Sequence, residues 1–263
     1  MNSQVNSDYS MMKSKLLLIA MLAAQTAAAQ ESAHILGIGS SNVLDTYLSQ
    51  EKYNGTGLTY LYIRERVKPE KHWGTIVEHE MSFSVGKDRN KQNSMMTGDY
   101  NLYWGRYHRW SLCHDRLQLY AGAAANATVG FLYTMQNSNN PAQLRASLQI
   151  MPSAIGKYAF TLWRQQFALR YEANLPLVGL AFSPNFGQSY YEIFGRGDYD
   201  HNIVPTTFIS APTFRQLVTL DWQISSRYRL RIGYLGNFQQ QQVNNLKQHL
   251  YTQRIILGIV LRK

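Results

Sequence analysis

Cysteine is nearly absent from this sequence, and so are long apolar runs. Cys113 is the only cysteine, so no disulfide can form within the chain. Beyond the first thirty residues no run of eighteen apolar residues occurs, which excludes a transmembrane helix there. Acidic residues are also scarce, 16 against 26 Lys and Arg. The resulting net charge of +10 favours anionic partners, but no nucleic-acid-binding motif accompanies it.

The first 29 residues have the pattern of a secretory signal peptide. Lys13 and Lys15 precede the apolar run LLLIAMLAA, and Ala27 and Ala29 provide the small residues of a cleavage site. The apolar run is too short to cross a bilayer as a helix. We therefore expect residues 1–29 to be removed on export.

The polar residues 1–10 are unusual for a signal peptide, and Met11 or Met12 is a more natural start. A disordered N-terminal extension is the alternative. No linker divides the remaining residues, so we interpret 30–263 as one domain.

The mature chain is rich in alternating tracts. In Thr161–Asn174 every second residue is mostly apolar or aromatic, and the residues between are polar or charged. This period of two is typical of a strand with unlike faces. Similar tracts occur at Trp73–Val85, Met96–Trp104, Arg116–Val129, Tyr228–Tyr234 and Tyr251–Leu261.

Such long strands with an aromatic face favour an all-β, antiparallel transmembrane β-barrel, in which lipid-facing and lumen-facing residues alternate. A strand in a soluble domain usually has about five or six residues. The alternative is a soluble periplasmic β-sandwich, which also alternates but generally uses shorter strands with fewer exposed aromatics.

The number of strands follows from the connections. Both termini on the periplasmic side require an even number of strands. We expect short periplasmic turns at 68–71, 111–115, 154–157 and 225–227, and longer outer connections at 41–55, 87–95, 131–142 and 239–248. Two further strands, Gln188–Phe194 and Asn202–Ile209, bring the total to about 12. If 176–212 is one extended loop, the number is 10.

This topology predicts an aromatic belt. Tryptophan and tyrosine favour the membrane–water interface, because one end of the side chain is apolar and the other forms hydrogen bonds. We expect six such residues to form a ring at the periplasmic end: Trp73, Trp110, Trp163, Trp222, Tyr158 and Tyr228.

The inward faces of the predicted strands carry many charges. We expect them to form a charge network in the lumen, with the members Glu78, Glu80, Asp99, Arg116, Arg145, Arg164, Arg170, Glu172, Arg215, Asp221, Arg229, Arg231 and Arg254. Buried charges persist when they are paired, so one interpretation is a cross-linked interior that holds the barrel in register. The other is a selective pore lined by arginine.

Specific function is expected in the outer connections, because long connections on a rigid scaffold commonly carry binding groups. The candidate outer-loop or rim surface consists of Ser189, Tyr190, Tyr191, Glu192, Asn244, Asn245 and His249. Ser189 and His201 suggest an acyl-transfer triad, but no nucleophile elbow frames Ser189. The predicted strands place the two residues at opposite ends of the barrel. We predict no catalytic residue, cofactor or metal; His108 and His114 match no zinc pattern.

Three segments resemble a family of uncharacterised outer-membrane proteins of Gram-negative bacteria that is filed as a domain of unknown function. They are LGIGSSNVLDTYLSQEKYNG (36–55), FSPNFGQSYYEIF (182–194) and YLGNFQQQQVNNLKQH (234–249). The resemblance implies a signal peptide and a β-barrel, and brings no established activity. Outer-membrane phospholipase and lipid A deacylase barrels are a looser comparison, because their histidine-then-serine arrangement is not found here.

We therefore expect a porin-like integral outer-membrane barrel, not an enzyme, with a structural role or a minor transport or surface-recognition role. Its expected partners are outer-membrane lipid, lipopolysaccharide and, during biogenesis, the barrel assembly machinery, and no nucleic acid. The alternatives are a barrel enzyme acting on lipid or lipopolysaccharide and the soluble periplasmic binding sandwich.

Overall fold

The computed structural model describes residues 31–67, 72–134 and 141–262. The predicted signal peptide and the predicted turn at 68–71 lie outside these residues. Within them, none of the helical segments has the length and apolar character that a membrane crossing requires.

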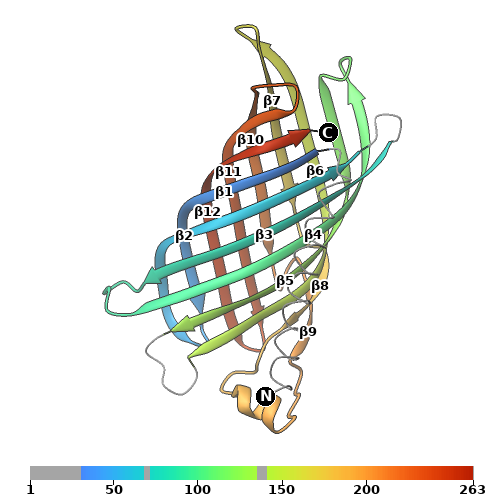
Figure 1. Cartoon of the computed structure of the whole chain (residues 1–263). Helices are drawn as coiled ribbons and strands as arrows, with labels where there is room; N and C mark the ends of the chain where they lie inside the picture. Colours follow the sequence, from blue (N-terminus) through green and yellow to red (C-terminus); the bar gives the residue numbers. More distant parts are fainter. Residues whose placement is uncertain (1–30, 68–71, 135–140, 263) are drawn as a thin grey trace, which may run out of the picture.

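In the residues that the structure describes, twelve strands and one short π-helix make up the fold. In chain order the strands are β1 (Glu31–Asp45), β2 (Ser49–Arg66), β3 (Trp73–Lys87), β4 (Ser94–Leu112), β5 (Leu117–Thr134), β6 (Ala142–Leu162), β7 (Gln165–Asn174), β8 (Val178–Phe182), β9 (Ile203–Thr207), β10 (Thr213–Gln223), β11 (Tyr228–Val243) and β12 (Leu246–Arg262). The π-helix η1 (Tyr191–Gly195) lies between β8 and β9. Figure 1 shows the long strands strongly tilted.

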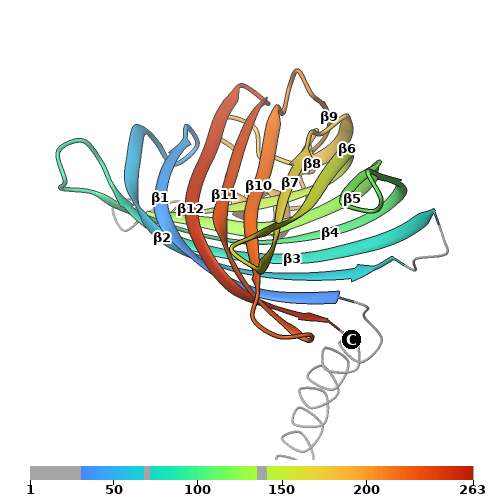
Figure 2. The same ribbon diagram turned by 90° about the horizontal axis from the view of Figure 1, so that it is seen from above.

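Ten of the strands close into an antiparallel barrel. The sheet runs β5-β4-β3-β2-β1-β12-β11-β10-β7-β6, and the β5–β6 pairing closes it. β8 and β9 lie outside this ring, where β8 continues along the edge of β6 beyond β7. Figure 2 shows the sheet curving around its interior. The predicted barrel is confirmed, with ten strands in the ring and two outside it.

The two faces of each strand differ as predicted. On β3, Met81, Phe83 and Val85 are exposed, whereas Glu78 and Glu80 are buried. In a sandwich the apolar face would be the buried one. Here the exposed outer wall is apolar and the interior is charged, so the soluble-sandwich alternative is wrong.

One predicted strand, Gln188–Phe194, is wrong, because η1 occupies this position. The Ser189 hydroxyl accepts a hydrogen bond from the Glu192 amide (3.2 Å), and the Glu192 carboxylate accepts one from the Ser189 amide (2.7 Å). This reciprocal pair is a capping box, which nucleates a helical turn. The predicted strand Asn202–Ile209 corresponds to β9, so 183–202 is a single outer connection.

The predicted positions of several turns are also wrong. Thr161–Asn174 is interrupted by a two-residue turn at Trp163 and Arg164, and residues 154–157 lie inside β6. On the outer side, the expected loop 41–55 is strand except for a three-residue turn, and 239–248 is strand except for Asn244 and Asn245. Strand pairing continues past the apolar band, because backbone hydrogen bonds do not require apolar side chains.

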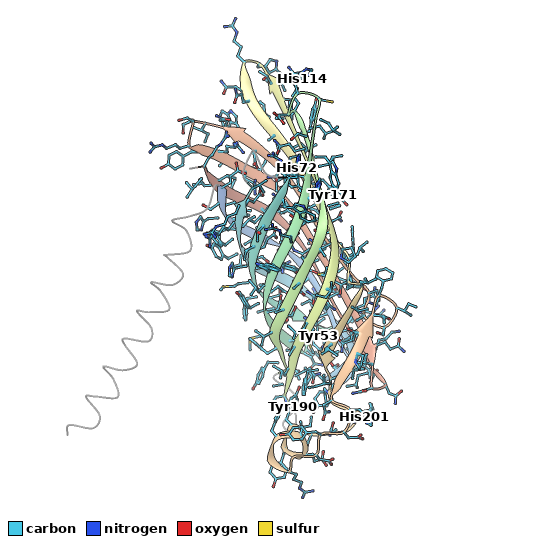
Figure 3. All side chains as sticks on the ribbon, turned by 90° about the vertical axis from the view of Figure 1, so that its right-hand side faces the viewer. Tyr53, His72, His114, Tyr171, Tyr190 and His201 are labelled. Carbon is cyan, nitrogen blue, oxygen red and sulfur yellow. The ribbon has the colours of Figure 1, made fainter. Side chains whose placement is uncertain are left out.

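The aromatic belt is confirmed. All six predicted residues are exposed and lie in or close to the turns and strand ends at the end of the barrel that carries the β4–β5, β6–β7 and β10–β11 turns. The described chain begins and ends there, at β1 and β12, and we refer to this as the periplasmic end. Figure 3 shows His72 and His114 toward this end and Tyr190 and His201 at the other.

The barrel interior is layered. One apolar cluster, which includes Ile35, Leu217 and Ile256, lies toward the periplasmic end, and a second, which includes Tyr53 and Leu250, lies toward the outer end. Charged side chains are buried between the two clusters. These side chains are the centre of the predicted lumen network.

Candidate functional site

Arg215 on β10 is the centre of the lumen network. Its side chain is fully buried, and its guanidinium donates to Glu80 (Nε, 2.8 Å), Glu172 (Nη1, 3.0 Å) and Glu78 (Nη2, 2.6 Å). The guanidinium carbon lies 4.5 Å from the centre of the Tyr103 ring. One arginine therefore links β3, β7 and β10 across the barrel interior.

Arg170 on β7 extends this network toward the periplasmic end. It forms ion pairs with Glu65 and Glu172, and its Nη2 lies 3.6 Å from Glu78. Glu65 was not among the predicted lumen residues, although it is buried and faces inward from β2. Its position, two residues after Ile63 on the buried face of this strand, is the signal that could have identified it.

Two further buried arginines differ in their partners. Arg231 forms a bidentate pair with Asp221 on the neighbouring strand, at 2.6 and 2.7 Å. Arg254 instead donates to hydroxyls and a backbone carbonyl, including Ser41 (2.9 Å) and Ser84 (2.8 Å). Gly57 makes room for it, because a Cβ there would lie 2.6 Å from Arg254 Nη2.

The remaining predicted lumen residues lie near the two ends of the barrel. Asp99 accepts a hydrogen bond from Asn101 (2.7 Å), and Arg145 donates to Gln239 (2.6 Å). Arg229 pairs with Glu31 at 2.8 Å. The lumen positions predicted for Arg116 and Arg164 are wrong. Both are exposed in or beside periplasmic turns, because β5 and β7 begin only after them, at Leu117 and Gln165.

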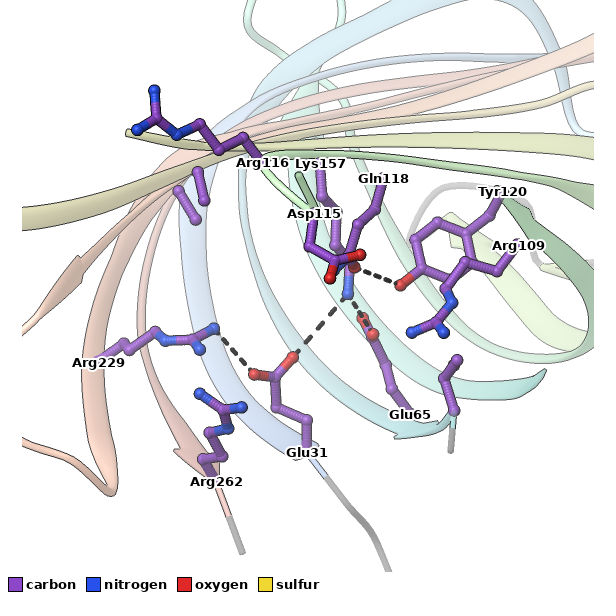
Figure 4. A pocket seen from close by; sticks show the side chains of 13 residues that line it. Glu31, Glu65, Arg109, Asp115, Arg116, Gln118, Tyr120, Lys157, Arg229 and Arg262 are labelled. Atoms are coloured by element: carbon purple, nitrogen blue, oxygen red, sulfur yellow. Dashed lines mark hydrogen bonds and ion pairs between the residues drawn. The ribbon is translucent and has the colours of Figure 1, made fainter. Parts of the chain in front are cut away.

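A polar pocket of about 350 Å³ opens at the periplasmic mouth, and Figure 4 shows its lining. Lys157 pairs with Glu65 and lies 3.9 Å from Glu31, which also holds Arg229. Tyr120 donates to Gln118 (2.8 Å) beside them. Beyond these groups, toward the barrel interior, lie the buried side chains of the first apolar cluster.

At the outer end, the connection 183–202 is anchored to the barrel. Tyr190 accepts a hydrogen bond from the Leu144 amide (2.7 Å) and donates to Gln143 (2.9 Å). Tyr47 donates to the Gln188 carbonyl (2.9 Å). Hydrogen bonds from the Ser189 amide and hydroxyl lower the pKa of the Glu192 carboxyl. Four of the candidate surface residues, Ser189 to Glu192, are therefore gathered in one structured segment.

The other three candidate surface residues are divided. Asn244 donates to the carbonyls of Ser183 and His201, both at 3.1 Å, so the β11–β12 turn supports the connection. Asn245 is exposed beside it. His249 lies on the outer wall, where its ring is stacked on Tyr251 and bonded to Asn42 (2.6 Å). Of the predicted loop or rim positions it therefore has the one on the rim and not in the loop, since β12 already begins at Leu246.

Ser189 and His201 share this connection, so the expectation that they lie at opposite ends of the barrel is wrong. The Ser189 hydroxyl donates to Glu192 (3.0 Å), and the His201 ring is bonded to Asp200 (2.5 Å). Within the described part of the chain no hydrogen bond joins Ser189 to His201. In that same part, no group of three or more His, Cys, Asp or Glu side chains is placed to hold a metal ion.

The chain is similar to several solved structures. The transport unit of the autotransporter AIDA-I from Escherichia coli is 10% identical, covers 89% of both chains and has a TM-score of 0.50. The translocator domain of the autotransporter NalP from Neisseria meningitidis is 10% identical over 98% of both chains, with a TM-score of 0.37. Ail, the attachment invasion locus protein of Yersinia pestis, is 11% identical over 89% of this chain and 99% of its own, with a TM-score of 0.33.

At this identity the similarity to the AIDA-I unit shows the barrel fold alone. No curated protein matches the chain. The family comparison covers almost the whole sequence. Over residues 11–262 the chain matches, and belongs to, the family described as "Protein of unknown function (DUF3316)".

Proposed function

We propose that this protein is a non-conducting integral barrel of the outer membrane of a Gram-negative bacterium, and that it presents the connection 183–202 for recognition at the cell surface. It is exported through the signal peptide at 1–29. The observation that carries the proposal is the buried Arg215 network, which obstructs the lumen at its centre.

The outer wall supports membrane residence. Ile255 is 76% exposed, Leu36 68% and Ile38 61%, and such residues recur around the barrel. In water this wall would be an apolar patch far larger than soluble proteins tolerate. In a bilayer the same residues contact acyl chains and stabilise the protein. Outer-membrane lipid, lipopolysaccharide and the barrel assembly machinery are accordingly the partners that we propose.

The interior of the barrel favours a closed barrel rather than a selective pore. A conducting path would have to displace Arg215. Among the described residues this would leave buried Glu80 without an ion-pair partner and Glu78 and Glu172 with Arg170 alone. The cost of such uncompensated charges is several kcal/mol, on the order of the whole stability of a small domain. Apolar side chains fill the lumen on both sides of this layer.

The outer connection supports a role in recognition. Four aromatic side chains along it are largely exposed: Phe186 70%, Tyr191 68%, Phe194 58% and Tyr199 69%. Exposed aromatic residues are enriched at binding hot spots, because they bury a large area at a small entropic cost. We assign no catalysis to this segment, because the Ser189 hydroxyl is bonded to Glu192.

Conductance measurement tests the closed barrel. We expect the folded protein, identified by its heat-modifiable migration, to insert into planar bilayers without producing stepwise current. A known porin in the same bilayer is the positive control. Regular single-channel steps from the folded protein would contradict the closed lumen.

The single cysteine tests the orientation. Cys113 is exposed in the periplasmic β4–β5 turn. We expect a membrane-impermeant maleimide to label it only after the outer membrane is permeabilised. A C113S/Y199C variant should be labelled in intact cells. The reverse pattern would show that the connection 183–202 faces the periplasm.

A further inference from the structure

The outer wall of β2–β4 carries three arginines at the periplasmic end, where the rest of the wall is apolar or aromatic. Arg64 and Arg66 lie on the outward series of β2, and Arg106 lies on that of β4. Between them is Thr75 on β3, which pairs in register with both Arg66 and Arg106. We call Arg64, Arg66, Arg106 and Thr75 the basic wall patch.

The patch already has the donors that an anion requires. Arg106 Nη1 lies 3.1 Å from the Thr75 hydroxyl, so this guanidinium is held directly beside the central residue. Arg66 and Arg106 are exposed on the two sides of Thr75. Two arginines and a threonine therefore occupy register-paired positions on three adjacent strands, an arrangement that suits a phosphate group.

No carboxylate of the described residues neutralises the patch. Among the described residues none of its three arginines forms an ion pair, although Arg170, Arg215 and Arg231 in the lumen all do. The carboxylates in the membrane segments of the same strands face inward and are buried: Glu65, Glu78, Glu80 and Asp99. The described carboxylates of β2–β4 in the membrane segments therefore face the lumen, and the three arginines of the patch face outward.

Buried polar atoms without partners lie on this same wall. Arg64 is only 8% exposed, and its Nε has no hydrogen-bond partner among the described residues; within the same part of the chain, the Tyr62 hydroxyl on β2 and His108 Nδ1 on β4 also lack one. An unpaired buried donor is costly, and native proteins usually satisfy such groups with a ligand, an ion or water. These unpaired atoms are a second observation, in addition to the unpaired charges. They indicate that a polar partner is missing at the basic wall patch.

Aromatic residues fix the depth of the patch. Arg106 lies 5.9 Å from the centre of the Trp73 ring, and His108 packs against Trp73 and Trp110. Trp73 and Trp110 belong to the periplasmic aromatic belt, which lies at head-group level. The arginines are therefore at the depth of phospholipid phosphates, where a lipid-facing guanidinium is tolerated.

We propose that the basic wall patch binds the phosphodiester head group of an anionic phospholipid of the periplasmic leaflet, such as phosphatidylglycerol. The inference rests on the proposed membrane residence. Arg66 and Arg106 hold the phosphate from two sides, Thr75 donates its hydroxyl, and the acyl chains lie along the apolar wall. Clusters of basic side chains at a membrane surface attract anionic head groups, and the same physical reason applies here.

The experiment titrates phosphatidylglycerol onto the purified, folded full chain in detergent and counts bound lipid by native mass spectrometry. We expect phosphatidylglycerol to bind at least about tenfold more tightly than phosphatidylcholine. The R66Q/R106Q variant should lose at least that factor, because each charge-assisted hydrogen bond contributes roughly tenfold. R164Q removes an exposed arginine at the same end, outside the patch, and should bind like the unchanged protein.

Several outcomes would overturn the site. Equal affinity for the two lipids, or an R66Q/R106Q variant that binds unchanged, excludes it. Displacement by inorganic phosphate at equal concentration would show a free-anion site, and tighter binding of lipopolysaccharide would contradict the assigned leaflet. If R66Q/R106Q does not fold, T75V, which removes one hydroxyl and conserves shape, should still weaken binding severalfold.

Insertion into phosphatidylcholine vesicles tests the proposed membrane residence separately from the proposed phospholipid site. A protein that inserts and becomes heat-modifiable, yet shows no preference for phosphatidylglycerol, overturns the lipid site alone. A protein that inserts into no vesicle overturns the membrane barrel.

Discussion

At the residue scale, the buried arginines of the lumen differ in which groups lose a partner when the arginine is substituted. Arg215 holds three carboxylates. Among the described residues, R215M leaves Glu80 without an ion-pair partner and leaves Glu78 and Glu172 with Arg170 alone. We expect this variant to lose about 3–5 kcal/mol of the free energy of unfolding, because breaking a buried network leaves charge uncompensated. Urea titration in lipid vesicles measures the loss.

Arg254 provides the matched control. Its hydrogen-bond partners are hydroxyls and backbone carbonyls, so R254Q strands no carboxylate. The loss should be about 1–2 kcal/mol, the value of neutral hydrogen bonds. If R254Q proved more destabilising than R215M, carboxylate pairing would not be what stabilises the interior.

The sequence indicated which side of a strand these residues occupy, but not their partners. Alternation places Glu78 and Arg215 on inward faces, yet their contact depends on closure and strand register, which a single sequence does not encode locally. For the same reason, the sequence alone does not predict the basic wall patch. Arg66 and Arg106 are 40 positions apart and meet only through their common pairing with Thr75.

At the element scale, alternation located the strands well wherever they face lipid. The tracts predicted at Trp73–Val85 and Met96–Trp104 lie inside β3 and β4. Outside the membrane band both faces of a strand are polar, so the pattern ends although the backbone ladder continues. Ser189 and Glu192 have the spacing of a capping box, but the aromatic residues around them have the alternation of a strand, so the two local signals conflict.

The β6–β7 turn contains a strained pair of residues. Trp163 and Arg164 adopt φ values of 49° and 63°, a left-handed conformation that favours glycine or asparagine. We expect R164G to raise the free energy of unfolding by about 0.5 kcal/mol, because relief of the left-handed strain exceeds the added chain entropy. Guanidinium titration of the folded barrel measures the gain.

The β11–β12 turn is the control for this change. Asn245 has a similar φ of 59°, but asparagine already tolerates this conformation. N245G should therefore change the stability by less than R164G does. A gain of equal size in both turns would show that the side chain at these positions does not matter.

At the scale of the whole molecule, one part of the chain closes the barrel and another part forms the exposed outer connection. The ring closes through β5–β6, and its interior is filled by the ionic layer and two apolar clusters. None of the residues that form these layers comes from the connection 184–201. Ten and twelve are both even numbers of strands, so the requirement for an even number does not distinguish between them. β8 and β9 extend the β7–β10 pair without entering the ring.

Deletion of the connection tests this separation. The Ser183 amide donates to the Asn202 carbonyl (2.8 Å), so the ends of the connection are already paired as in a hairpin. Replacement of 184–201 by Asn-Gly should therefore close the chain with a short turn of the favoured kind. We expect the shortened protein to remain heat-modifiable and non-conducting in planar bilayers, because its lumen is unchanged. Appearance of single-channel current would show that the connection, and not the Arg215 layer, closes the barrel.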